Sequence, residues 1–155
     1  MRVVRYVPQI DAQRLVVVLC GPAGAGKTTA ARASGLEVFD RDDPEWSSEK
    51  QFTTRLADLA RDPRARAVVI RSGATSSARA RARKLTNATH VFVMTAPLPE
   101  LERRVRERNR ADYVAGLQSL RSWFERFERD DGVADFPGWT PVLAGGQPLR
   151  TSESW

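Results

Sequence analysis

The chain has 155 residues, of which 41% are hydrophobic and 28% charged, a composition that predicts one globular domain large enough to bury a core. No apolar run approaches the ~20 residues of a membrane span, and the first residues lack the apolar core of a signal peptide. The single cysteine, Cys20, excludes an internal disulfide and is assigned to the core. We therefore predict a cytoplasmic protein with no membrane partner.

The formal net charge of +6 is unevenly distributed. Residues 71–110 contain ten Lys and Arg residues and three Glu residues, a net charge of +7, so the rest of the chain sums to −1. This positive segment attracts either a nucleic-acid backbone or only the phosphates of a nucleotide. The sequence leaves both partners open and makes no prediction of the oligomeric state.

Three regions are expected along the chain. Residues 1–14 contain several β-branched residues before Pro8, which fits a short edge strand or an unstructured lead-in. Residues 15–147 are expected to form the main domain, and residues 148–155 a loose C-terminal tail.

The strongest motif is Gly21-Pro22-Ala23-Gly24-Ala25-Gly26-Lys27-Thr28-Thr29, which reads G-x-x-x-x-G-K-[ST], the phosphate-binding P-loop. An apolar run over 15–20 precedes it with the length of a buried parallel strand, and 28–33 continues it as a helix that ends near Gly35. This order of strand, loop and helix is the context that the motif requires. The nine residues of the motif are therefore predicted to bind a nucleoside triphosphate.

The residue types of the motif indicate the role of each part. Gly21, Gly24 and Gly26 let the loop turn its amides inward as an anion-binding nest at the positive end of the helix. Lys27 is predicted to reach the β- and γ-phosphates, and the Thr28 hydroxyl to coordinate Mg²⁺.

A short strand over 36–39 leads directly into Asp40-Arg41-Asp42-Asp43-Pro44. Ligands of open α/β sheets bind beyond the carboxyl ends of the strands. Asp40 is therefore predicted to accept a proton from a substrate hydroxyl or to hold the water shell of the metal. Asp42, and with less support Asp43, is a second candidate metal ligand. The alternative is that these two carboxylates only cap a turn before Pro44.

The next elements extend the same pattern. Residues 46–62 predict a helix with Phe52, Leu56 and Leu59 on one face, and Trp46 packs in the core or stacks on a base.

Residues 67–70 predict a third buried strand, which brings Arg71 to the edge of the sheet that carries Asp40. There Arg71 is either part of the site or simply exposed to solvent. No apolar run ends in Asp on this strand, so the common Walker B signature is missing and Asp40 is the best substitute.

Two further helices carry most of the positive charge. Residues 76–85 are predicted to form a helix with four basic residues, Arg79, Arg81, Arg83 and Lys84. These residues either form a basic surface for nucleic acid or are simply solvated. Residues 90–94 are predicted to form a strand, in which His90 has a structural role. A charged helix is then predicted from Pro97 or Pro99 to Arg110.

The charged helix has a thin apolar face of Leu101 and Val105, which suits either a mobile lid or a surface helix with Glu–Arg pairs. A lid would bring arginines to the transferring phosphates. The candidates are Arg103, Arg104, Arg106, Arg108 and Arg110. Of these, Arg104 and Arg108 share one face of the helix and are taken as the catalytic pair.

The last third of the domain has one clear helix. Residues 112–130 form this predicted helix, whose apolar stripe belongs to the core or, as the alternative, stacks on bases; the stripe contains Leu117, Leu120, Phe124 and Phe127 and is widened by Trp123. Residues 139–143 are predicted to form a short last strand. Alternating strands and helices predict an α/β fold of three layers, the P-loop NTPase fold, with a mostly parallel central sheet and helices on both faces.

Residues 15–130 resemble the small P-loop kinases, through the P-loop at the start, the acidic motif after the second strand and the Arg-rich helix after the fourth. The chain looks most like polynucleotide 5′-kinases and zeta toxins, and like small phage-encoded P-loop ATPases. The resemblance implies ATP and Mg²⁺ as cofactors, 21–29 as the phosphate cradle, Asp40 as base for the acceptor hydroxyl, and phosphate-binding arginines within 103–110.

The sequence thus predicts an ATP-dependent phosphotransferase, whose acceptor is a nucleic-acid 5′-hydroxyl or another small hydroxyl compound. One alternative is a nucleotide-binding ATPase that acts with nucleic acid or a protein partner. Another is a degenerate P-loop domain that is kept for structure.

Overall fold

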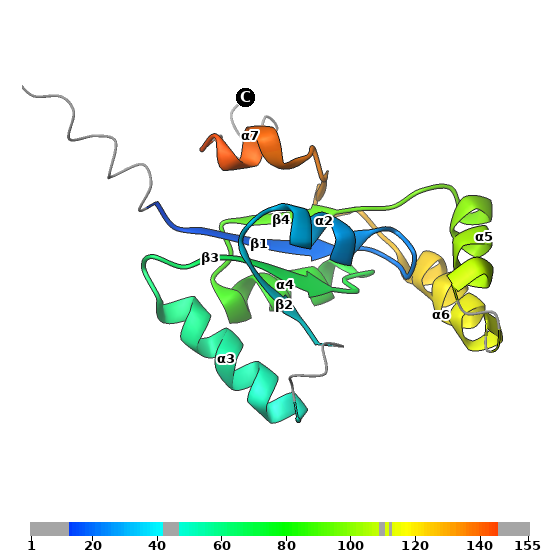
Figure 1. The fold of residues 1–155 in the computed structure, drawn as a ribbon, viewed down its shortest axis with the longest axis horizontal. Coiled ribbons are helices and arrows are strands. Elements are labelled where there is room, and N and C mark those ends of the chain that lie inside the picture. The colour runs from blue at the N-terminus through cyan, green and yellow to red at the C-terminus, as the bar shows by residue number, and fades with distance from the viewer. Residues whose placement is uncertain (1–12, 42–46, 109–110, 112, 146–155) are drawn as a thin grey trace, which may run out of the picture.

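The computed structural model describes residues 13–41, 47–108, 111 and 113–145. Its single sheet has five strands, all parallel, in the order β2-β3-β1-β4-β5 (Figure 1). The strands are β1 (Leu15–Cys20), β2 (Glu37–Asp40), β3 (Arg66–Arg71), β4 (His90–Val93) and β5 (Ala134–Asp135). The helices are α2 (Lys27–Ala33), α3 (Glu49–Arg61), α4 (Ser76–Thr86), α5 (Leu98–Arg108), α6 (Tyr113–Arg126) and α7 (Trp139–Leu143).

Several expectations fall on other parts of the chain. The N-terminal lead-in or edge strand lies outside the described residues, apart from Gln13 and Arg14, and the C-terminal tail lies wholly outside them. Asp42, Asp43 and Trp46 also lie outside them. The proposed domain boundaries stay a prediction.

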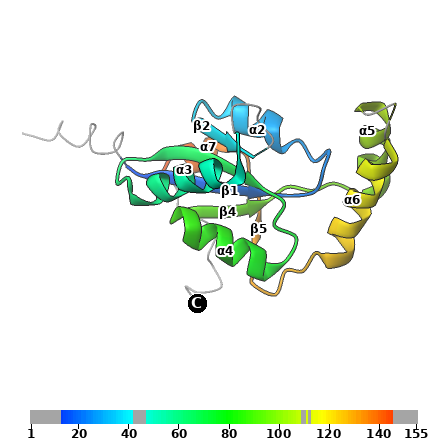
Figure 2. The ribbon, with the colours of Figure 1, turned by 90° about the horizontal axis from the view of Figure 1, so that it is seen from below.

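Two apolar clusters lie on opposite faces of the sheet and confirm the predicted three layers. On one face, Phe52, Leu56 and Leu59 of α3 pack with Ala82 of α4 against alternate residues of β1 and β3. On the other face, Ala31 of α2 and Val142 of α7 pack against the remaining residues of the same strands. Every residue of β1 is buried, as expected for a central parallel strand covered on both sides. Figures 1 and 2 show these helices above and below the sheet.

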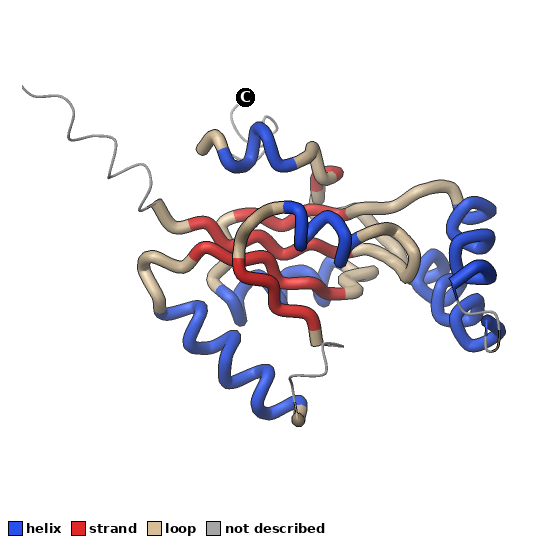
Figure 3. Tube along the Cα trace, viewed as in Figure 1, coloured by secondary structure: helices blue, strands red, loops and turns tan. Residues whose placement is uncertain are grey.

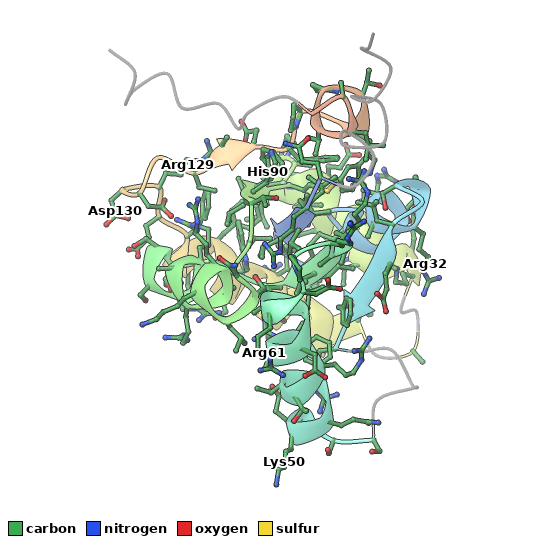
Figure 4. The ribbon with its side chains drawn as sticks, turned by 90° about the vertical axis from the view of Figure 1, so that its left-hand side faces the viewer. Arg32, Lys50, Arg61, His90, Arg129 and Asp130 are labelled. Atoms are coloured by element: carbon green, nitrogen blue, oxygen red, sulfur yellow. The ribbon has the colours of Figure 1, made fainter. Side chains whose placement is uncertain are left out.

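Helix ends follow local capping chemistry. Ser48 caps α3 through its side chain, which accepts a hydrogen bond from the Gln51 amide, and Glu49 lies in the first turn. The helix therefore begins three residues later than its predicted start at Trp46. At the opposite end of α3 from Arg61, Lys50 extends away from the body of the protein (Figure 4).

Helices α5 and α6 form an arm beyond the carboxyl ends of the strands (Figures 2 and 3). Leu101 and Val105 of α5 pack with Leu117 and Leu120 of α6, and all four side chains are buried. The thin apolar face predicted for α5 is therefore covered by its neighbour. The arm joins the sheet through Trp123, which packs against Ala74 and Val93.

The predicted last strand over 139–143 is wrong, because this segment forms the short helix α7. Proline lacks an amide hydrogen and is tolerated in the first turn of a helix, which is where Pro141 lies. Burial of Val142 and a 2.7 Å hydrogen bond from the Trp139 indole to the Ala30 carbonyl hold α7 against α2. The fifth strand is instead β5, which pairs with the last two residues of β4.

Arg79 also differs from the prediction of an exposed basic helix, since it is only 1% exposed. Its guanidinium donates to both carboxylate oxygens of Asp131, at 3.0 and 2.8 Å, and to the carbonyls of Gly73 and Ala74, at 2.8 and 3.1 Å. It also donates to the Glu128 carbonyl. Arg79 shares the buried face of α4 with Ala82 and Thr86, at helical spacing. The segment after α6 is thereby fixed to the loop between β3 and α4.

We predict that Asp131→Asn lowers the free energy of unfolding by about 3 kcal/mol at pH 7, because it leaves the buried guanidinium without its carboxylate. The Arg79 hydrogen bond lowers the pKa of Asp131 from its ordinary value of 3.8, so the stabilisation is present above that pH and is lost as the pH falls below it. Urea unfolding of both proteins from pH 7 to pH 3 measures this difference.

Asp58→Asn is the matched control, because Asp58 pairs with Arg61 on the exposed face of α3. We expect it to cost less than about 1 kcal/mol. An equal cost for the two variants, or a cost for Asp131→Asn that does not shrink in acid, would contradict the role of the buried pair.

Candidate functional site

The loop between β1 and α2 needs glycine for two different reasons. Gly21 has a φ of 156°, and a Cβ at this position would lie 2.2 Å from the Met94 carbonyl oxygen. Gly26 caps α2 in the left-handed conformation, with a φ of 94°. The loop amides therefore lead directly into the positive end of α2, where anions bind.

Lys27 is the first residue of α2, and its ammonium group reaches back across the loop. It donates to the Gly21 carbonyl and, at 3.3 Å, to the Arg71 carbonyl at the end of β3. The charge is therefore held between the ends of two neighbouring strands. When a nucleotide binds, the Lys27 ammonium can donate to its phosphate oxygens in place of these backbone carbonyls.

Asp40 comes together with the P-loop as the sequence predicts. The Thr28 hydroxyl donates to a carboxylate oxygen of Asp40 at 3.1 Å, and both residues are half-buried. A hydroxyl and a carboxylate are hard oxygen ligands of the kind that Mg²⁺ takes, usually with substrate phosphates and water. Among the described residues there is no cluster of three or more His, Cys, Asp or Glu side chains. The pair thus fits a magnesium ion that binds together with a nucleotide.

Helix α5 contacts the P-loop directly, and it does so through Arg104. The guanidinium donates to the Gly24 carbonyl at 2.9 Å and to Glu100 at 2.7 Å. Ala25 of the loop packs with Leu101 and Val105 of the same helix.

The other candidate arginines of α5 have different surroundings. Arg103 pairs with Glu100 and Glu107, the Arg106 guanidinium lies 6.0 Å from the Tyr113 ring centroid, and Arg108 is exposed. Arg110 lies outside the described residues. The Glu–Arg pairs expected of a surface helix are therefore present, and among the described candidates Arg104 is the arginine that hydrogen-bonds the loop.

One contact of the site was missed at the level of sequence. The Ser72 carbonyl accepts a hydrogen bond from the Gly21 amide at 3.1 Å and another from the Trp123 indole at 2.6 Å. The apolar stripe of α6 had assigned Trp123 to the core, and its side chain is indeed buried. The available signal was the indole N–H, which needs an acceptor when it is buried.

Two residues with reactive side chains take structural positions, as predicted. Burial raises the pKa of the Cys20 thiol to about 11, so it stays protonated at neutral pH. His90 is 7% exposed, shares a 2.8 Å hydrogen bond with the Thr89 hydroxyl and lies within the packed sheet region (Figure 4).

In the part of the chain that the structure describes, no helix is both long enough and apolar enough to span a membrane. No protein-family model matches the chain, and no curated protein matches it.

Solved structures do resemble the chain. A gluconokinase from Sinorhizobium meliloti 1021 is 21% identical with a TM-score of 0.55, over 86% of this chain and 93% of that one. The shikimate kinase from Acinetobacter baumannii in complex with shikimate is 22% identical with a TM-score of 0.50, over 92% and 86%. An unliganded sugar kinase from Janibacter sp. HTCC2649 is 21% identical with a TM-score of 0.51, over 86% and 91%. The predicted fold is therefore confirmed: the chain has the fold of the small P-loop kinases.

Proposed function

We propose that the chain is an ATP-dependent phosphotransferase that phosphorylates a hydroxyl group of a small molecule. The observation that carries this proposal is the hydrogen bond between Thr28 and Asp40, because it brings a carboxylate from β2 to the P-loop hydroxyl that would bind the metal. A P-loop domain that only holds its fold has no need for a carboxylate at this position.

The residues of the loop divide the chemistry among them. The amides of 21–29 and the Lys27 ammonium hold the phosphates, and Thr28 with Asp40 holds Mg²⁺, with Asp42 as a proposed second carboxylate. A magnesium ion held by these residues would supply positive charge to the nucleotide phosphates.

Asp40 also takes the proton of the acceptor hydroxyl. The acceptor oxygen forms a bond to the γ-phosphorus, the bond from phosphorus to the bridging oxygen breaks, and ADP leaves with the electron pair. The transition state of phosphoryl transfer is loose, with little bonding to either oxygen, so most of the rate enhancement comes from positioning and charge stabilisation. Asp40 therefore acts mainly by orienting the hydroxyl.

The arm supplies cations to the transferring group. Arg104 already lies against Gly24 of the loop, and Arg108 lies one turn further along the same helix face. Arg104 needs only to exchange the Gly24 carbonyl for a phosphate oxygen, which is a charge-assisted and stronger acceptor.

The comparisons favour a small hydroxyl compound over a nucleic-acid end. The similar structures are named as a gluconokinase, a shikimate kinase and a sugar kinase, whose acceptors are small molecules. The proposed nucleic-acid surface also loses one of its cations, since Arg79 is buried against Asp131. We therefore retain the ATPase alternative only as an outcome of the test below.

We predict that Lys27→Ala and Asp40→Asn each reduce phosphate transfer from labelled ATP by about 100-fold or more. Lys27→Ala removes the cation that binds the transferring group. Asp40→Asn removes the proton acceptor and one metal ligand. The assay contains Mg²⁺ and a panel of sugar acids, sugars, nucleosides, 5′-hydroxyl oligonucleotides and water alone.

Asp42→Asn, tested beside Asp40→Asn, separates the role of Asp42 from that of Asp40, the last residue of β2. Full transfer by Asp40→Asn together with loss in Asp42→Asn would move the catalytic role to Asp42. Label released to water alone by the wild type, at a rate raised by nucleic acid or a partner, would replace the kinase by the ATPase alternative.

The arm gives a separate prediction. We expect Arg104→Met to reduce kcat at least tenfold, because the variant loses the cation adjacent to the loop. Arg103→Met is the matched control, since Arg103 pairs with the same Glu100 but does not contact the loop, and its kcat should change by less than twofold. Equal effects of the two variants on kcat would contradict a specific role for Arg104.

A further inference from the structure

Arg71 is the last residue of β3, and its environment differs from that of the other arginines that are buried or half-buried. Within the described residues, the guanidinium of each of the others donates to a carboxylate or a backbone carbonyl. These are Arg14, Arg41, Arg66, Arg79 and Arg104. The half-buried Arg71 guanidinium has no hydrogen-bond or ion-pair partner among the described residues, and it lies 5.9 Å from the ring centroid of Phe52.

The register of the sheet brings Arg71 next to the proposed catalytic edge. Asp40 pairs with Ile70, so Arg71 lies one residue further along the neighbouring strand. Adjacent strands are about 5 Å apart. Asp40 and Arg71 are therefore close neighbours at the carboxyl end of the sheet.

The two side chains leave the edge on opposite faces. Phe39 packs on the α3 face, so Asp40 lies on the α2 face, where it contacts Thr28. Val69 also packs on the α3 face, so Arg71 returns to that face, over Phe52 of α3. If the acceptor hydroxyl binds at Asp40, the P-loop with its phosphates lies on the α2 side of it and Arg71 lies on the α3 side.

Neighbouring charges leave Arg71 available for an anion. Glu49 at the start of α3 is within electrostatic reach of Arg71, but it binds Arg41 at 2.6 Å. The Arg41 hydrogen bond is the main cause that lowers the pKa of Glu49, and the charge of Arg71 contributes less. Glu49 is thus already neutralised by another arginine.

We propose that Arg71 binds a carboxylate or phosphate group of the acceptor, so that the acceptor is a hydroxyl compound with an anionic group. This inference rests on the proposed phosphotransfer function. A planar guanidinium donates two parallel hydrogen bonds to either group, and a partly desolvated guanidinium gains most from a charged acceptor. The Phe52 ring beneath it restricts the orientation of the guanidinium.

Calorimetry on the whole chain, with saturating Mg²⁺ and a non-hydrolysable ATP analogue, tests this inference with matched compounds. The pairs are gluconate with glucitol and glycerate with glycerol, and glycerol 3-phosphate distinguishes a phosphate from a carboxylate. We expect an anionic member to bind at least tenfold more tightly than its neutral partner. We also expect Arg71→Met to abolish this difference in affinity. Arg71→Lys should keep part of it, because lysine retains the positive charge but cannot donate two parallel hydrogen bonds.

Arg55→Met is the matched control. Its guanidinium lies 5.5 Å from the ring centroid of Phe39 and pairs with the exposed Glu37, so it resembles Arg71 in packing but is already paired. The preference for the anion should survive in this variant. Equal binding of neutral and anionic compounds, failure of every anion to bind, or a preference that persists in Arg71→Met would overturn the inference.

Parallel assays of label transfer separate this inference from the proposed function. An anion that binds through Arg71 and takes no phosphate would support the anion site and contradict the kinase. Transfer to a neutral acceptor that Arg71→Met leaves unchanged would support the kinase and overturn the anion site.

Discussion

Parallel pairing of the strands is the constraint on which the candidate site depends. In a parallel sheet all carboxyl ends meet at one edge. The register then fixes which residues are neighbours there: Cys20 pairs with Arg71, and Asp40 with Ile70. The P-loop starts directly after Cys20, so its lysine and threonine reach the ends of β3 and β2 within hydrogen-bonding distance. Residues from three separate segments therefore converge at one edge of the sheet.

The arm of α5 and α6 is tied to this edge at two places, and both involve backbone carbonyls. Arg104 holds the Gly24 carbonyl, while Trp123 shares the Ser72 carbonyl with the Gly21 amide. Because a carbonyl has two lone pairs, Ser72 bonds the loop and the arm simultaneously. The backbone of the P-loop and the side chain of Trp123 in α6 therefore share one acceptor atom. The arm and the loop are coupled by direct contacts rather than by proximity alone.

Local patterns in the sequence predicted the buried strands, the P-loop, the apolar face of α3 and the meeting of Asp40 with the loop. The interactions that escaped prediction join residues far apart in the chain. Arg79 and its partner Asp131 are separated by 52 residues, so no local pattern distinguishes this buried arginine from the exposed Arg81 and Arg83. Helix α7 escaped for the same reason, since a five-residue segment takes its conformation from contact with α2 rather than from its own propensity.

The positive charge of 71–110 shows why a summed charge is a weak guide to a partner. Its arginines have unrelated roles: Arg79 neutralises Asp131 inside the fold, Arg103 and Arg104 pair with glutamates of their own helix, and Arg81 and Arg83 face solvent. Paired charges contribute little to a long-range field, because each partner cancels the other within a few ångströms. A charge acts on a ligand where it lies at a binding edge and lacks a protein partner. Among the described arginines of this segment, the guanidinium of Arg71 meets this criterion, and Lys27 lies at the same edge, where it donates to the carbonyls of Gly21 and Arg71. They lie on two sides of the position proposed for the acceptor hydroxyl, so one attracts the phosphate donor and the other the acceptor.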